Sequence, residues 1–309
     1  MKTVVKHPEG IIVPLLTPVD ANEDIQFEQL AKLVEHVIEG GVDGIFVMGT
    51  SGEVGRFTME ERMQIIRAVA DQVNGRVAVY AGVSDCGTRM VKKHITNAYL
   101  AGADAVVSTL PYYFPTTHEM EMVDFFRDIA DFSPLPVIMY NIPVAVGVSI
   151  PCRVIDQLYT HPNIVAIKDS SADAVLLEKM LVRYQSETFA VLVGDEALLQ
   201  FGFEKGVDGC IPSLANPFPR VLAALYRAAE DGDKERMAKM CGVVSQFNQF
   251  NKYCDSWMSP NIWRKTALSM MGVMDDYFTT PYEPVSEAGK VKVAQRVEAY
   301  QAMVAAGEI

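Results

Sequence analysis

The sequence predicts an α/β protein built as a (β/α)8 barrel with a C-terminal helical extension. Short apolar runs alternate with segments of helical periodicity, the apolar runs number eight, and they stop after roughly residue 231. Continuous apolar runs are typical of parallel strands covered on both faces, and eight strand–helix units make this barrel. The competing architecture is an open doubly wound sheet. We favour it less, because neither a Gly-x-Gly-x-x-Gly nor a Gly-x-x-x-x-Gly-Lys motif follows the first expected strand.

The expected strands are the eight apolar runs themselves. They cover residues 11–16, 44–49, 77–83, 105–110, 136–142, 164–168, 189–194 and 209–214. Helices are expected between them, for example over 27–38 and 59–73, where apolar residues recur at helical spacing. Gly-x-Asp segments at Gly41, Gly102 and Gly206 each precede an expected strand, and a glycine there can take the left-handed conformation that ends a helix.

The length of 309 residues fits one α/β barrel of roughly 250 residues with a tail. We expect residues 1–231 to form the catalytic barrel and residues 232–309 to form a helical extension packed on it. Helical patterns near 234–251, 260–271 and 287–305 support the extension.

Composition excludes several classes of partner. Lys and Arg total 27 against 39 Asp and Glu, a net charge of −12, so we expect no binding to nucleic acid or to an anionic membrane. No apolar run approaches the roughly 18 residues that span a bilayer, and the N-terminus lacks a signal-peptide pattern. The odd number and wide spacing of the cysteines fit neither a disulfide framework nor a Cys-x-x-Cys metal site; these are Cys86, Cys152, Cys210, Cys241 and Cys254. We therefore expect a cytoplasmic protein.

The active site of such a barrel lies where the strands end, which draws attention to Lys168. This lysine ends the run 164–168 and shares its face with Ile164 and Ala166, so it should point into the barrel. Burial favours the neutral amine, which can attack a carbonyl and form a Schiff base. The alternative is a structural lysine paired with an acid such as Asp195 or Glu53, and the lysine alone leaves both interpretations open.

Two further strand ends carry suitable groups. Residues 49–53, Gly-Thr-Ser-Gly-Glu, offer the hydroxyls of Thr50 and Ser51 and several backbone N–H groups, a turn that suits a small carboxylate. Taken alone, this motif is more often an ordinary glycine turn. Tyr140 could be a core tyrosine, but its place at a strand end beside the lysine strand favours a role in proton transfer.

We expect a reaction that needs neither metal nor organic cofactor. None of the five histidines ends an expected strand; they are His7, His36, His94, His118 and His161. A zinc enzyme would bring several imidazoles together at the rim of the barrel.

With these residues in place, the chain resembles the pyruvate-dependent class I aldolases, the family of dihydrodipicolinate synthase and N-acetylneuraminate lyase. The resemblance covers roughly residues 10–300 and rests on four motifs in family order. These are Gly-Thr-Ser-Gly-Glu at 49–53, Pro-Tyr-Tyr at 111–113, Tyr-Asn-Ile-Pro at 140–143 and the strand lysine with Asp-Ser at 168–170. Each motif alone is weak, but the set is specific.

The resemblance implies a role for each matched residue. Lys168 would form the imine with the keto carbon of pyruvate, and Thr50 and Ser51 would hold the pyruvate carboxylate. Tyr140 would shuttle protons: its phenol would protonate the carbinolamine and later give or take the proton of the hydroxyl that the aldol step makes or cleaves.

The resemblance also implies an assembly. Family members are usually homotetramers built as dimers of dimers. Tyr113 matches the tyrosine that a neighbouring subunit contributes to the proton relay through Thr50. Ile211 matches the residue whose backbone carbonyl lies near the imine.

One departure from the family bears on the substrate. Dihydrodipicolinate synthases place an arginine two residues after the proline of Tyr-Asn-x-Pro, where it binds the carboxylate of aspartate semialdehyde, and this chain has Ala145 there. A charge-assisted hydrogen bond of about 1.5–3 kcal/mol is missing, which disfavours that reaction. Arg56 in the loop after the Gly-Thr-Ser-Gly-Glu turn could replace the charge.

Other residues resemble the sugar-binding set of sialic acid lyases. In those enzymes an Asp-Glu pair and nearby hydroxyls grip the sugar chain, and the matching residues here are Ser170, Asp195, Glu196 and Ser213. Acids and hydroxyls suit a polyol, because each sugar hydroxyl needs an acceptor as well as a donor. The alternative is that Asp195 and Glu196 only cap the following helix. Gly194 also departs from the pattern, since sialic acid lyases tend to carry an aromatic residue there.

The favoured hypothesis is a lyase that reversibly cleaves a 2-keto-3-deoxy sugar acid, N-acetylneuraminate-like or shorter, into pyruvate and an aldehyde. Within the family, the alternatives are dihydrodipicolinate synthase and a keto-deoxy sugar acid dehydratase. Outside enzymes, the chain could be a silent keto-acid sensor or scaffold. The presence of both Lys168 and Tyr140 argues against that last interpretation.

Overall fold

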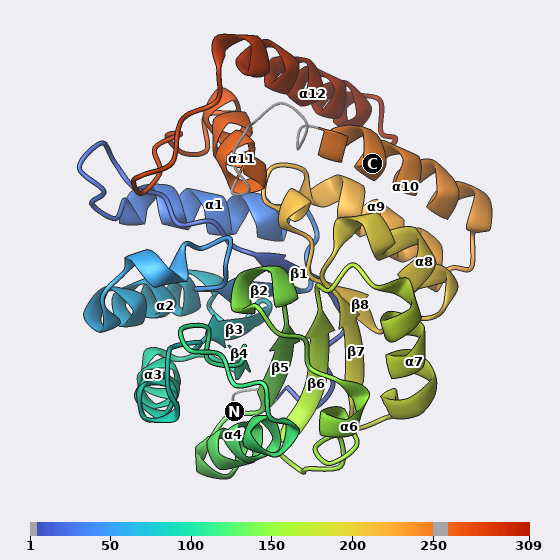
Figure 1. Cartoon of the computed structure of the whole chain (residues 1–309). Helices are drawn as coiled ribbons and strands as arrows, with labels where there is room; N and C mark the ends of the chain where they lie inside the picture. Colours follow the sequence, from blue (N-terminus) through green and yellow to red (C-terminus); the bar gives the residue numbers. More distant parts are fainter. Residues whose placement is uncertain (1–4, 250–258) are drawn as a thin grey trace.

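The computed structural model describes residues 5–249 and 259–309. In this part of the chain, eight parallel strands close into a barrel in which each strand neighbours the next and β1 pairs with β8 (Figure 1). The strands are β1 (Gly10–Pro14), β2 (Gly44–Val47), β3 (Ala78–Gly82), β4 (Ala105–Ser108), β5 (Val137–Asn141), β6 (Ile164–Asp169), β7 (Ala190–Val193) and β8 (Gly209–Cys210). The predicted (β/α)8 barrel with a C-terminal helical extension is confirmed.

Several strands end earlier than the apolar runs that predicted them. The run at 44–49 gives a strand only to Val47, because Met48 takes a left-handed φ of 58° and turns the chain out of the sheet. The run at 209–214 gives only Gly209–Cys210, since Pro212 lacks an N–H for a strand ladder and residues Ser213–Ala215 form the short helix η3. The buried residues beyond these strand ends belong to the rim of the barrel rather than to its wall.

The helices lie around the outside of the barrel (Figure 1). Those linked to the strands are α1 (Phe27–Glu39), η1 (Val54–Arg56), α2 (Met59–Val73), α3 (Thr88–Ala101), α4 (Glu119–Phe132), α5 (Pro143–Val146), α6 (Cys152–Ile155), α7 (Ala174–Tyr184), η2 (Glu196–Leu198), α8 (Leu199–Glu204) and α9 (Pro219–Glu230). The apolar face that predicted α1 is buried, as Leu30, Leu33 and Val34 show. At the start of α2, the side chains of Thr58 and Glu61 cap each other's backbone N–H groups.

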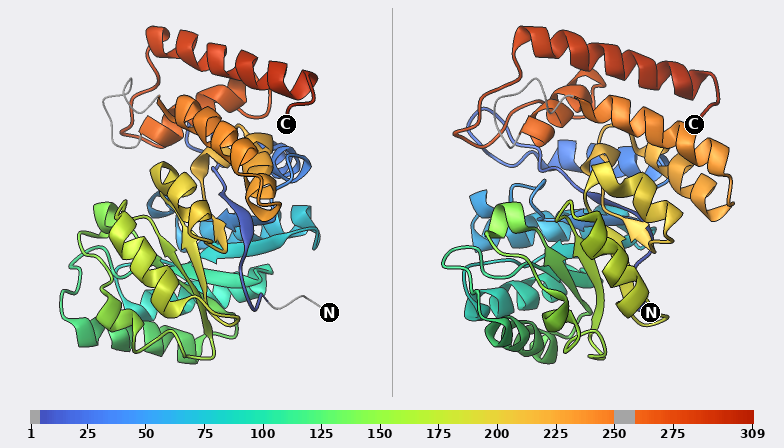
Figure 2. Two further views of the ribbon diagram at one scale, coloured as in Figure 1. Left: turned by 90° about the vertical axis from the view of Figure 1, so that its right-hand side faces the viewer. Right: turned by 45° about the vertical axis from the view of Figure 1, so that its right-hand side comes forward.

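The extension consists of α10 (Lys234–Asn248), α11 (Ser259–Met270) and α12 (Glu287–Ala305). These helices gather at one end of the molecule with α12 outermost (Figure 2). The predicted helix 234–251 ends at Asn248, and its last two residues lie outside the described residues. We propose residue 231 as the boundary of the barrel, because α9, the last helix linked to a strand, ends at Glu230.

The three Gly-x-Asp segments have a structural role at the far end of the barrel. Their glycines have φ values of 86°, 101° and 81° at Gly41, Gly102 and Gly206, as the sequence predicts for helix ends. The aspartate of each segment accepts a backbone N–H from the preceding strand of the barrel: Asp43 from Ile11 (2.8 Å), Asp104 from Val79 (2.9 Å) and Asp208 from Val191 (2.7 Å). The repeat therefore joins neighbouring strands at their N-terminal ends, away from the rim that carries Lys168.

Within the two described ranges, no helix is long and apolar enough to cross a bilayer. Cys86, Cys152, Cys210 and Cys241 are free thiols there, and Cys254 lies outside the described residues. Burial raises the pKa of the Cys210 thiol well above its usual value, so this cysteine behaves as an inert core residue.

Candidate active site

Lys168 lies inside the barrel near the C-terminal end of β6 and is only 4% exposed. It is in register with Tyr140 of β5, and its Nζ lies 4.0 Å from the centroid of the Tyr140 ring and 5.1 Å from that of Phe46. Neither acid proposed as a structural partner pairs with it: among the described residues, Lys168 forms no ion pair, and the carboxylate of Glu53 pairs with Lys265. The amine of Lys168 is therefore buried against two aromatic rings, has no acid partner among the described residues, and can react with a carbonyl carbon.

A cavity of about 200 Å³ surrounds this lysine. It brings together most of the residues that the sequence singled out, namely Thr50, Ser51, Tyr140, Lys168, Ser170, Asp195, Ile211 and Ser213. These residues come from the ends of β2, β5, β6, β7 and β8, so the convergence of strand ends expected for a barrel rim is present. Glu196 and Tyr113 do not line this cavity.

The loop that carries Thr50 and Ser51 is held in a strained backbone conformation. Met48 and Glu53, which flank it, both have a φ of 58°, which residues other than glycine rarely adopt. The backbone of Met48 approaches β3 so closely that a Cβ on Gly82 would overlap the Met48 carbonyl oxygen. The packing around this loop therefore fixes the positions of both hydroxyls.

Glu53 anchors the same loop to the C-terminal extension. Its Oε1 lies 2.6 Å from Nζ of Lys265 on α11, and its Oε2 accepts hydrogen bonds from the backbone N–H and the hydroxyl of Thr279. Lys265 also donates to the carbonyl of Tyr277 at 3.0 Å, and its burial lowers its pKa. The final glutamate of the Gly-Thr-Ser-Gly-Glu motif is thus a structural anchor.

Glu196 forms a second link to the same helix. Its Oε1 accepts from the Ser213 hydroxyl (3.0 Å) and the Leu214 N–H (2.7 Å), and its Oε2 accepts from Nη2 of Arg264 at 2.8 Å. Glu196 lines a cavity of about 610 Å³ that faces α10 and adjoins the lysine cavity, since Asp195 and Ser213 line both. It therefore connects the loops after β7 and β8 to α11.

Asp195 caps a short helix and lies at the edge of the lysine cavity. Its carboxylate accepts the N–H of Ala197 at 2.8 Å and so caps η2, as the structural alternative expects. It also lines the Lys168 cavity.

Gly194 lies against Lys168 and Ser170. A Cβ at this position would overlap the hydroxyl oxygen of Ser170 and lie 2.7 Å from Cε of Lys168. A side chain at this position would therefore have to displace the side chains of Ser170 and Lys168.

The residues that follow Tyr140 and Lys168 in the motifs form a buried polar pair of their own. Asp169 accepts a hydrogen bond from Nδ2 of Asn141 at 2.7 Å and another from the Ser171 hydroxyl at 2.8 Å. Burial raises the pKa of Asp169, against the effect of these hydrogen bonds. Because neighbours along a strand point to opposite faces, this pair lies outside the barrel wall and holds β5 to β6 behind the site.

Tyr113 lies apart from the lysine cavity. Its side chain is 67% exposed and packs edge-on against Phe114, which is 86% exposed. Its neighbour Tyr112 instead lines a second cavity, and burial raises the pKa of the Tyr112 phenol to about 12.

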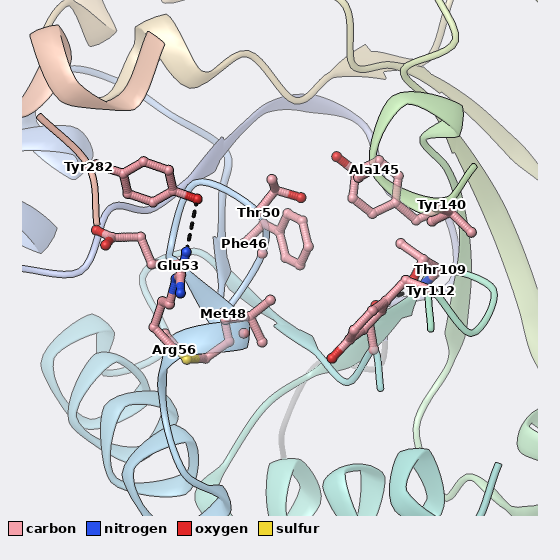
Figure 3. A pocket seen from close by; sticks show the side chains of 15 residues that line it. Phe46, Met48, Thr50, Glu53, Arg56, Thr109, Tyr112, Tyr140, Ala145 and Tyr282 are labelled. Atoms are coloured by element: carbon pink, nitrogen blue, oxygen red, sulfur yellow. Dashed lines mark hydrogen bonds between the residues drawn. The ribbon is translucent and has the colours of Figure 1, made fainter. Parts of the chain in front are cut away.

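The second cavity measures about 410 Å³ and adjoins the lysine cavity, since Thr50 and Tyr140 line both. Its other lining side chains are largely apolar and include Phe46, Met48, Ala145 and Val146. Figure 3 shows Tyr112, Tyr140 and Ala145 on one side of this cavity and Arg56 and Tyr282 on the opposite side. Nη2 of Arg56 donates a hydrogen bond to the Tyr282 hydroxyl at 3.2 Å. Sequence reasoning missed Tyr112 and Tyr282, although Tyr112 belongs to the Pro-Tyr-Tyr motif.

The histidines lie elsewhere. His94 packs between Arg62 and Asp85, and burial lowers its pKa. Across residues 5–249 and 259–309, no group of three His, Cys, Asp or Glu side chains is placed to hold a metal ion.

The barrel, with a buried lysine and a phenol in one cavity at its rim, defines an enzyme of the class I lyases, which work through a lysine imine. The chain belongs to the dihydrodipicolinate synthetase family, whose model matches residues 7–300, and members of this family are pyruvate-dependent lyases.

Individual relatives agree with this assignment. The chain is 32% identical to the 4-hydroxy-tetrahydrodipicolinate synthase of Laribacter hongkongensis, over 94% of this chain and 98% of that protein. It is 34% identical to an uncharacterized DapA-like lyase of Halobacterium salinarum, over 74% of each chain. Among solved structures it is similar to YagE, a prophage protein of Escherichia coli K12 determined in complex with pyruvate. That similarity has a TM-score of 0.88 and 28% identity and covers 95% of this chain and 98% of that one.

Proposed function

We propose that the protein reversibly cleaves a 2-keto-3-deoxy sugar acid, N-acetylneuraminate-like or shorter, into pyruvate and an aldehyde through an imine on Lys168. The observation that carries the proposal is the state of this lysine. It is buried, packs on the Tyr140 ring, forms no ion pair among the described residues, and opens into a cavity that also contains Thr50 and Ser51.

The reaction follows from the positions of these groups. The neutral amine of Lys168 adds to the keto carbon to give a carbinolamine. The Tyr140 phenol then gives its proton to the carbinolamine hydroxyl, which leaves as water, so that the protonated imine and the Tyr140 phenolate are formed. The hydroxyls of Thr50 and Ser51, with the N–H groups of their loop, bind the carboxylate next to the keto carbon. Tyr140 takes the proton of the C4 hydroxyl as the C3–C4 bond breaks, which releases the aldehyde and leaves an enamine. Protonation of the enamine at C3 and addition of water then return pyruvate and the free lysine.

The sugar chain is proposed to lie among the polar residues on the other side of Lys168. Ser170, Asp195 and Ser213 line the lysine cavity and supply both donors and acceptors. Glu196 acts in this proposal indirectly, because it holds the Ser213 hydroxyl in place.

A second candidate is dihydrodipicolinate synthase, which joins pyruvate to aspartate semialdehyde. The name of the Laribacter hongkongensis relative favours it, whereas Ala145 argues against it. A keto-deoxy sugar acid dehydratase is a third candidate with the same imine. Product analysis separates them, since a dehydratase releases water without pyruvate.

We further propose that the protein is a cytoplasmic homotetramer, a dimer of dimers, in which Tyr113 completes the proton relay of a neighbouring subunit through Thr50. The exposure of Tyr113 and Phe114 supports this, because two adjacent aromatic side chains in solvent are typical of a contact surface. Light scattering tests the assembly, and a monomer would contradict the role of Tyr113.

Borohydride trapping tests the reaction class. The protein is incubated with pyruvate, reduced, digested and mapped by mass spectrometry, because reduction converts an imine into a stable amine. We expect the adduct on Lys168. Lys265 is an internal control, since it is equally buried but paired with Glu53, and it should stay unlabelled. A folded protein without an adduct on Lys168, or a Lys168→Arg variant that keeps full turnover, would overturn the proposal.

A further inference from the structure

Asn261 lies in the first turn of α11 and lines the Lys168 cavity. It belongs to the C-terminal extension, whereas the other polar side chains that line this cavity come from the barrel and its loops. Asn261 is only 8% exposed, and among the described residues its side-chain amide has no hydrogen-bond partner. A ligand that displaces water from the cavity must pair with this amide, because a buried amide without a partner costs free energy.

Two ion pairs on the next turn of α11 fix the position of Asn261. Arg264 and Lys265 follow it by three and four residues, so the three side chains share one face of the helix. Arg264 binds Glu196 on the loop after β7 at 2.8 Å, and Lys265 binds Glu53 on the loop after β2 at 2.6 Å. The helix is therefore anchored to two loops of the barrel rim, and the amide of Asn261 is held in place at the wall of the cavity.

We propose that the side-chain amide of Asn261 binds a hydroxyl group on the aldehyde half of the substrate and so selects hydroxylated aldehydes. The inference rests on the proposed function and deepens it. A carboxamide offers N–H donors and a carbonyl acceptor, which suits a hydroxyl group that donates and accepts. The residues proposed to bind the sugar chain line the same cavity as Asn261; they are Ser170, Asp195 and Ser213.

The keto end of the substrate has other partners in this proposal. Its carboxylate is assigned to the hydroxyls and N–H groups of residues 49–53, and its keto carbon to Lys168. A carboxamide also stays neutral, so Asn261 takes no part in the proton transfers assigned to Tyr140. Asn261 therefore acts as a specificity-determining residue that contacts the chain beyond the bond that breaks.

Aldol synthesis from pyruvate and matched aldehydes tests the inference without knowledge of the natural substrate. D- and L-glyceraldehyde are compared with propanal, and D- and L-erythrose with butanal, since the members of each pair differ only in their hydroxyl groups. The measured quantity is the ratio of kcat/KM for the hydroxylated aldehyde to kcat/KM for its plain partner. Comparison of this ratio between variants cancels differences in the intrinsic reactivity and hydration of the aldehydes.

Three variants give the expected pattern. Asn261→Leu keeps the size of the side chain and removes its polar atoms, so it should lower the ratio by about tenfold, the effect of one lost hydrogen bond. Asn261→Ala should lower it as well. Both variants should trap pyruvate on Lys168 as the wild type does, because the keto end is bound elsewhere. Asn97→Leu on α3, outside the lysine cavity, is the matched control and should leave the ratio unchanged.

The outcomes separate the two proposals. An unchanged ratio in Asn261→Leu, or an equal loss for both members of each pair, would overturn the role of Asn261 and leave the proposed function standing. Pyruvate trapping without synthesis from any of these hydroxylated aldehydes would overturn this inference and leave the imine on Lys168 standing. An absence of pyruvate trapping in the folded wild-type protein would overturn the proposed function and this inference together.

Discussion

Glu53 and Lys265 form a buried ion pair of 2.6 Å that joins the loop of Thr50 and Ser51 to helix α11. Both side chains are almost completely buried, and the second carboxylate oxygen is taken by Thr279. Because each charge depends on the other in a dry environment, the pair is sensitive to the loss of one member.

Lys265→Met should therefore destabilise the protein strongly. Removal of one partner from a buried pair costs about 3–5 kcal/mol, because the remaining charge is buried without compensation. Denaturant unfolding measures the loss. The double variant Glu53→Gln with Lys265→Met should recover much of it, whereas Lys290→Met, which breaks an exposed pair with Glu287, should have no measurable effect. Equal stability of Lys265→Met and Lys290→Met would contradict the structural role of the pair.

Gly194→Ala should impair catalysis more than folding. The added methyl group would press on Cε of Lys168 and on the Ser170 hydroxyl, which displaces the amine. We expect pyruvate imine formation to slow by about 100-fold, the effect of a displacement near 1 Å at a reacting group. Borohydride reduction of the reaction mixture at a series of short times, with the Lys168 adduct quantified at each time, measures this rate. Gly242→Ala on α10, where a Cβ meets nothing within 4 Å, is the control and should react like the wild type.

Tyr140→Phe should separate chemistry from binding. Loss of the phenol should lower turnover by about 10²–10⁴-fold, since proton transfer loses its catalyst, with a much smaller effect on the affinity for imine-forming ligands. Tyr184→Phe is a matched control: this buried phenol donates to the Cys152 carbonyl at 2.9 Å outside the site, so its loss should lower stability and leave turnover unchanged. Small and equal effects of Tyr140→Phe on turnover and affinity would show that its phenol is only structural.

His94 should contribute to a loss of stability in mild acid. Burial lowers the pKa of His94 below its usual 6.5, and Arg62 acts in the same direction, while Asp85 opposes both. Below pH 6.5 the unfolded chain therefore binds a proton on this residue more readily than the folded protein, and stability falls as the pH falls towards the folded-state pKa.

The free energy of unfolding, measured in urea across this pH range, tests the assignment. His94→Gln should show a smaller loss of stability on acidification than the wild type, and His118→Gln, which changes an exposed histidine, should show the same loss as the wild type. An unchanged pH dependence in His94→Gln would exclude the assignment.

The strands, the barrel and most of the lysine cavity could be predicted from sequence because they depend on local patterns. Apolar runs mark the strands, and a parallel barrel brings strand ends together wherever they lie in the chain. The positions of Thr50, Tyr140 and Ser213 at strand ends therefore predict that they lie beside Lys168, and all three line its cavity.

The other features of the site depend on contacts between residues that are distant in sequence. No local pattern shows that Glu196 meets Arg264, or that Tyr282 lies over Arg56, because those partners come from the extension. Strand ends were also extended too far at Met48 and Pro212, where a backbone turn ends the strand although the chain remains buried. Burial and strand pairing leave the same apolar pattern in the sequence.

Arg264 and Lys265, which are consecutive on α11, contact Glu196 and Glu53 on different loops of the rim. During synthesis the sheet can close once β8 has emerged, because β8 completes the ring with β1. The two loops gain their anchors only when α11 follows. A nascent or truncated chain that ends before α11 would therefore have a closed barrel without a fixed catalytic rim, so that folding of the sheet and onset of activity are separate events.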